Sequence, residues 1–245
     1  MALNIGTREP GRMRDTALIA KLRTGLFGIS FILLAAGCGS SVRLDPPTIP
    51  EPNINRIPVT VAVRLPENFN DFVHQEEVLG REEWTIRLGK SNAVFFTQLL
   101  GYMFDTVIMI GPDEDAYAHT FDALIEPSID AFEFSVPNQT KTDAFAVWIR
   151  YRIKVYDRHG TMVANMPVSA YGKSLTTTMG GSNALQRAAV LAMRDAAALM
   201  IMKFDEQTLF TSLADPSTVL PAFVEEDGKN PTEAQAVILG GSSNE

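Results

Sequence analysis

The chain contains one cysteine and three histidines among its 245 residues. One cysteine excludes an internal disulfide and a metal site built from several thiolates. The histidines, at positions 74, 119 and 159, lack the short spacing of metal-ligand pairs, so we expect no metal and no other cofactor. The apolar run that ends before Cys38 is too short for a transmembrane helix, which needs about 20 apolar residues.

Catalytic motifs are also missing. Gly-Lys-Ser occurs at 89–91 and at 172–174, but a phosphate-binding loop needs a further glycine five positions before the glycine of this triplet. Trp84 and Pro167 occupy those two positions. Ser182 lacks the Gly-x-Ser-x-Gly frame of many hydrolases. We therefore predict that the protein is not an enzyme.

The charge is negative, with 29 acidic against 21 basic residues and a formal net charge of −8. Nucleic-acid binding needs a basic surface that displaces counterions, so we expect no nucleic-acid partner. Hydrophobic residues make up 46% of the chain, which is enough for a sizeable core.

The N-terminal segment has the three parts of a secretory signal peptide. Basic residues precede a short apolar run from Gly25, and small residues end it at Ala35-Ala36-Gly37. The cysteine that follows makes this segment resemble a bacterial lipoprotein signal. That resemblance implies cleavage before Cys38 and covalent acyl chains on Cys38 as the only non-protein group. The start codon stays open between Met1 and Met13.

The resemblance to a lipoprotein signal also predicts the cellular location of the protein. In enteric bacteria, aspartate after the lipidated cysteine retains a lipoprotein in the inner membrane, and this chain has Gly39. We expect a lipid anchor in the outer membrane, with the protein facing the periplasm. Prolines at 46, 47, 50 and 52 predict that residues 38–56 form an extended tether after the lipidated cysteine.

Hydrophobic periodicity predicts the elements of the remaining chain. Alternation predicts strands over 57–65 and 145–156, and β-branched residues predict a strand over 104–110. We expect one further strand over 121–134, with a break at Pro127, and another over 161–171 that completes a hairpin with 145–156. Helical spacing predicts a helix from Ser91 or Asn92 to Met103 and another over 183–203, with a loop over 172–182 before it. We predict the α+β class, with a mostly antiparallel sheet and two main helices packed on it, in a single domain over 57–210. Residues 211–245 are expected to be a disordered tail.

Several segments between residue 57 and about 204 resemble the YajG-like envelope lipoproteins. They are the opening VTVAV, the segment YMFDTVIMI, the segment DALIEPSI, the turn Tyr156-Asp157-x-x-Gly160 and the alanine-rich last helix. The order of these segments carries the resemblance. It implies an outer-membrane lipoprotein that assembles with other envelope proteins, and it supplies no catalytic residue.

The strand over 145–156 offers one candidate binding surface. Strand geometry puts Trp148, Arg150, Arg152, Lys154 and Tyr156 on the same face. One interpretation is an ordinary solvated face, since long side chains often cover apolar surface. The other is a docking surface for a partner, because aromatic residues and arginine are enriched at interfaces.

Two functions remain open. The first is a non-catalytic accessory or assembly subunit of an envelope complex for export, transport or a surface structure. The alternative is a binding module for a small apolar or lipid ligand, in a groove lined by the aromatic helix residues Phe95, Phe96, Leu99 and Tyr102. Against the alternative, aromatic residues at helical spacing are more often core.

Overall fold

The computed structural model describes residues 40–79, 82–139, 142–176, 180–205, 209–213, 215, 217–218 and 220–224. The predicted signal peptide 1–37, Cys38 and the end of the predicted tail, 225–245, lie outside the described residues. Within them, no helix has both the length and the apolar character needed to cross a membrane.

The larger sheet has five strands in the order β5–β2–β6–β7–β8. Their bounds are β2 Ile57–Arg64, β5 Phe104–Ile110, β6 Ala123–Ser135, β7 Ala144–Asp157 and β8 Met162–Leu175. Strand β2 runs parallel to β5 and to β6, whereas β6, β7 and β8 form an antiparallel meander. The turn between β7 and β8 contains Gly160 at a φ of 84°, a conformation that glycine adopts without steric cost.

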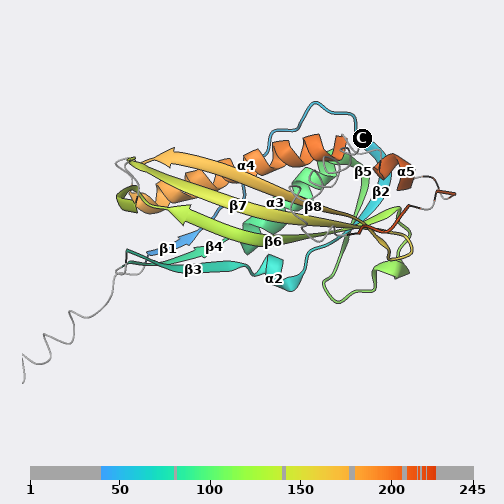
Figure 1. The fold of residues 1–245 in the computed structure, drawn as a ribbon, viewed down its shortest axis with the longest axis horizontal. Helices are drawn as coiled ribbons and strands as arrows, with labels where there is room; N and C mark the ends of the chain where they lie inside the picture. Colours follow the sequence, from blue (N-terminus) through green and yellow to red (C-terminus); the bar gives the residue numbers. More distant parts are fainter. Residues whose placement is uncertain are drawn as a thin grey trace, which may run out of the picture.

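A smaller sheet has three strands in the order β1–β4–β3. They are β1 Ser40–Arg43, β3 Val73–Val78 and β4 Glu82–Arg87. Strands β3 and β4 form an antiparallel hairpin, and β1 adds to β4 in parallel. Strand β1 begins at the first described residue, Ser40, and the small sheet lies toward one end of the molecule (Figure 1).

The predicted fold class is wrong. In place of an α+β domain with one mostly antiparallel sheet and two main helices, the described residues form a β-rich structure with eight strands in two sheets, and helices are the smaller part. Sequence periodicity shows only part of the small sheet. Trp84, Ile86 and Leu88 alternate, which leaves either a short strand or a loop open where the structure has β4. Strand β3, with the sequence VHQEEV, is too polar to show clear alternation. Periodicity also could not show that β2 pairs in parallel, since pairing between distant segments leaves no local signal.

Two predicted boundaries also differ. Strand β6 is continuous through Pro127, because β2 pairs with β6 only as far as Ile125 and so leaves that side of Pro127 free of a ladder partner. A register shift follows between Ile129 and Ala131. Residues 172–175, predicted as loop, are the last part of β8.

The helices cover the inner face of the large sheet. Helix α3 spans Gly89–Met103 and α4 spans Gly181–Asp205, with the short helices α2 Glu67–Asn70 and α5 Leu209–Leu213 at the margins. Helix α4 runs along β7 and β8 behind the sheet (Figure 1). Its buried stripe is alanine-rich, with Ala188, Ala189, Ala192 and Ala196 fully buried. Small side chains permit close approach, and the α4 backbone lies directly over Gly172.

The core between α3 and the sheet is aromatic. Phe96 packs edge-on against Phe69, Phe95 and Tyr151, with ring centroids 5.2, 5.1 and 5.3 Å away. Tyr151 is fully buried, and its hydroxyl donates to Asn92 Oδ1 at 2.7 Å. This hydrogen bond joins α3 to the centre of β7.

The segment after β1 lies against the body of the protein. Val42, Leu44 and Ile49 are buried, and the Ser91 hydroxyl donates to the carbonyl oxygen of Leu44. Farther along, Arg194 on α4 donates to the carbonyl oxygen of Thr48 at 3.0 Å. Residues 40–48 of the predicted tether are thus held against the protein by the pairing of β1 with β4 and by hydrogen bonds to α3 and α4.

Candidate docking face

Within the described residues, the loop between β5 and β6 covers one end of the outer face of the large sheet. There, the loop between β5 and β6 buries a small apolar cluster on the sheet surface: Ala62, Ile110, Ala116, Phe121 and Leu124. The loop is held by Glu114, which accepts from the Gly111 N–H at 3.0 Å and contacts His119 at 2.7 Å. These two contacts lower the pKa of Glu114. The face remains open toward the other ends of β6, β7 and β8.

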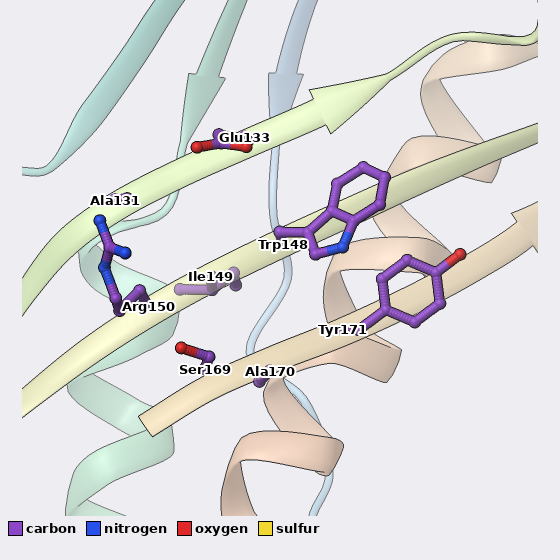
Figure 2. A pocket seen from close by; sticks show the side chains of 8 residues that line it. All are labelled: Ala131, Glu133, Trp148, Ile149, Arg150, Ser169, Ala170 and Tyr171. Atoms are coloured by element: carbon purple, nitrogen blue, oxygen red, sulfur yellow. The ribbon is translucent and has the colours of Figure 1, made fainter. Parts of the chain in front are cut away.

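Two aromatic side chains stand on this open part. Trp148 on β7 and Tyr171 on β8 are directly opposed across the strands, with ring centroids 5.0 Å apart and planes at 46°. Both are large and well exposed, at 43% and 42%. They flank a shallow cavity of about 320 Å³ whose lining also includes Glu133, Arg150 and Ser169 (Figure 2).

Arg150 and Arg152 differ in their surroundings. Arg152 forms an ion pair with Asp130 at 2.7 Å and donates to Asn165 at 3.3 Å. Arg150 is exposed and forms no ion pair within the described part of the chain. Of the two arginines, only Arg150 therefore presents a guanidinium that is available to a partner.

Lys154 and Tyr156 lie farther along the same face, away from the cavity. Lys154 is half-buried between Glu126 and Asn165 in the strand register. Tyr156 hydrogen-bonds to Glu126, and burial, followed by the Glu126 charge, raises the pKa of Tyr156. Glu126 in turn pairs with Arg64 at 2.8 Å. Tyr156 thus belongs to the network beneath the β5–β6 loop.

The neighbouring edge of the sheet is protected. Strand β8 is an edge strand, and the N–H of Tyr171 points away from β7 and donates to Asp195 on α4 at 2.9 Å. Because N–H directions alternate along a strand, Pro167 occupies a position whose N–H would also point outward, and proline has none. Both features discourage a further strand from pairing here, so a partner would contact the face.

The aromatic face of α3, considered above as a possible ligand groove, is part of the core. Phe95, Phe96 and Leu99 are buried, and the two phenylalanine rings pack on each other and on Tyr151. Tyr102 is half-buried, and its hydroxyl accepts from Gln98 at 3.0 Å. These contacts fill the space that an apolar ligand would need.

The remaining predictions concern metal ligands, the histidines and Cys38. The described residues contain no group of three or more metal-ligating side chains. His74 and His119 each contact a glutamate, Glu76 and Glu114. Cys38 lies outside the described residues, so its acylation stays a prediction, as do the absence of cofactors and of catalysis.

Sequence reasoning missed Tyr171, Glu133 and Ser169. A register count from the turn at Asp157–Gly160 would have placed Ala170 opposite Trp148, because an irregularity between Val155 and Tyr156 shifts the true register by one residue to Tyr171. Glu133 carried no signal either, because the register shift between Ile129 and Ala131 changes its partner on β7.

No protein-family model matches this chain, and no curated protein matches it. Solved structures similar to it include a putative lipoprotein from Caulobacter crescentus, at 13% identity over 50% of this chain and 82% of that one, with a TM-score of 0.33. A hypothetical protein from Chlamydia trachomatis has 10% identity over 60% and 95%, with a TM-score of 0.39. A minor lipoprotein from Acinetobacter baumannii has 13% identity over 61% and 92%, with a TM-score of 0.36.

At TM-scores below 0.5, these likenesses carry no argument about the function of this chain. None of the three descriptions names a YajG-like lipoprotein, so that resemblance stays a prediction.

Proposed function

We propose that the protein is a lipid-anchored lipoprotein of the bacterial envelope that acts as a non-catalytic accessory or assembly subunit. The anchor is Cys38, and the domain faces the periplasm from the outer membrane. The signal-like segment before Cys38 and Gly39 after it support this location. Partner docking occurs through the open outer face of β6, β7 and β8.

One observation carries the docking assignment: the exposed pair Trp148 and Tyr171 beside the unpaired guanidinium of Arg150. Trp148 and Tyr171 form an exposed aromatic pair with polar neighbours, and tryptophan, tyrosine and arginine are the residue types most enriched among those that dominate binding energies at interfaces. Arg150 fits a carboxylate on the partner, because a guanidinium binds a carboxylate through two parallel hydrogen bonds. The occupant is therefore a protein surface that presents an acidic side chain next to an apolar one.

The decisive change is Arg150→Glu, which reverses the charge at the centre of the docking face. We expect it to reduce recovery of the envelope partner at least tenfold, because a carboxylate would then face a carboxylate. The measurement is quantitative affinity purification of the full-length acylated protein from detergent-solubilised envelopes after mild cross-linking. Arg56→Glu is the matched control, since Arg56 is exposed and lies off this face.

A second measurement locates the contact. A photo-crosslinking amino acid in place of Tyr171 should capture the same partner, whereas one in place of Tyr117 should not. Tyr117 is similarly exposed but lies on the β5–β6 loop. Equal partner recovery from wild type and Arg150→Glu, or equal cross-linking from the two tyrosine positions, would refute docking at this face.

A further inference from the structure

A second, larger cavity lies on another side of the molecule, where the small sheet meets the start of α3. It has a volume of about 580 Å³ and is lined by the end of β1, the end of α2, the first residue of β3, the end of β4 and the first turn of α3. Segments far apart in sequence thus converge on one hollow outside the docking face.

Three cations from three different elements line this cavity. They are Arg43 at the end of β1, Arg87 at the end of β4 and Lys90 in the first turn of α3. The parallel pairing of β1 and β4 places Arg43 directly opposite Arg87. None of the three forms an ion pair within the described residues. Like charges held side by side without counter-charges are unfavourable, and a bound anion would relieve that cost.

The start of α3 adds hydrogen-bond donors to the same wall. The residue before the helix is Leu88, which offers no capping side chain. Gly89 donates its N–H to the Phe72 carbonyl at 3.1 Å, whereas the N–H groups of Lys90 and Ser91 have no acceptor among the described residues. Free N–H groups in a first helical turn favour an anion.

Glycine is required at position 89 because a side chain there would overlap the backbone of Asn70 and Phe72. The Gly-Lys-Ser triplet at 89–91 forms the first turn of α3, directly after Leu88 and the end of β4. It lacks the full phosphate-loop motif, but it sets the free N–H groups of that turn at the cavity wall.

Two carboxylates also line the cavity, and neither neutralises the cations. Asp45 accepts a hydrogen bond from Gln186 on α4 at 2.6 Å, which holds its carboxylate toward that helix. Asp71, just after α2, forms no ion pair in the part of the chain that is described. Three cations and the positive end of a helix thus outweigh two carboxylates.

We propose that this cavity is a binding site for a phosphate group, held by Arg43, Arg87 and the N–H groups of Lys90 and Ser91. Two guanidinium groups suit the several oxygens of a phosphate, which accept paired hydrogen bonds. The phosphate comes from a phospholipid headgroup or from a soluble phosphate compound. A headgroup is within reach if Cys38 is anchored as proposed, since Arg43 follows Cys38 by five residues, at most about 17 Å of extended chain.

The test uses the full-length acylated protein in a neutral detergent, titrated with inorganic phosphate at constant ionic strength. Amide NMR shifts of Lys90 and Ser91 should move and saturate. In the Arg43→Gln/Arg87→Gln variant the affinity should fall at least tenfold, since each lost charge-assisted hydrogen bond costs about that factor. The matched control is Arg56→Gln/Lys173→Gln, which removes two exposed cations that do not line this cavity and should keep wild-type affinity.

A competition step then identifies the source of the phosphate. Phosphatidylglycerol mixed into the detergent should weaken apparent phosphate binding if a headgroup occupies the site. No competition would indicate a soluble ligand, and either result supports the site. The proposal fails if the two amides do not respond to phosphate, or if both double variants bind alike. Partner recovery in the cross-linking experiment should be unaffected by Arg43→Gln/Arg87→Gln, which keeps the two proposals separable.

Discussion

Gly172→Ala is expected to destabilise the protein by about 3 kcal/mol, at the upper end of what overpacking usually costs. An added Cβ would overlap the carbonyl oxygen of Ala188 and crowd the backbone of Leu191 and Ala192 on α4. These are backbone atoms of a long helix, so no side-chain rotation can relieve the overlap. The whole of α4 would have to move off β7 and β8, opening the alanine-lined contact that buries this side of the sheet.

The measurement is the free energy of unfolding by urea titration of the full-length protein in neutral detergent. Gly101→Ala is the matched control, because Gly101 lies in the last turn of α3 and nothing lies within 4 Å of the added Cβ. The control should gain about 0.5–1 kcal/mol, since alanine favours a helix over glycine. Equal stability of wild type and Gly172→Ala would show that α4 does not pack as closely as described.

Tyr151→Phe is expected to cost about 1–3 kcal/mol, although it removes a single oxygen atom. Tyr151 and Asn92 are both fully buried and share a 2.7 Å hydrogen bond. Asn92 Nδ2 already has no partner among the described residues. Loss of the tyrosine hydroxyl would leave the Asn92 oxygen without a donor as well, in a site that water does not reach.

A double-mutant cycle separates this buried pair from general packing. Asn92→Leu combined with Tyr151→Phe removes both partners and should be less destabilising than the sum of the single changes, because no polar atom of the pair remains. Urea unfolding of the four proteins gives the coupling energy. Strict additivity would mean that the hydrogen bond contributes nothing.

The same tyrosine provides a pH readout. Burial raises the pKa of Tyr151 far above its ordinary value, whereas in the unfolded chain the hydroxyl ionises near pH 10. The folded-state pKa is the higher one, so the stability is fully present below about pH 10 and falls as the pH rises further. Wild type should therefore lose stability more steeply than Tyr151→Phe between pH 10 and 11. Parallel curves would contradict this assignment.

The sequence by itself determined which faces of the long strands are inward. Alternation in residues 145–156 separated six inward side chains from Trp148 and Arg150, and the burial along β7 follows that division. Side-chain period is a local property of an extended backbone, so it can be read without knowing the neighbours. Alternation in residues 57–65 likewise marked the buried side chains Val59, Val61 and Val63 of β2, and the bounds of β2 and β5 agree with the predicted ranges 57–65 and 104–110 to within one residue.

Tertiary structure alone decided which of those outward residues are engaged within the protein and which are open to the proposed docking. The sequence treats Arg150 and Arg152 alike, but only Arg152 meets a carboxylate, since Asp130 lies beside it at the irregularity in β6. Tyr171 contacts Trp148 because the register of the hairpin places the two residues opposite each other. Tyr156 is hydrogen-bonded to Glu126 instead. The cavity at the first turn of α3 likewise depends on the parallel pairing of β1 with β4. Contacts between segments far apart in the chain arise from packing and register, and no local pattern encodes them.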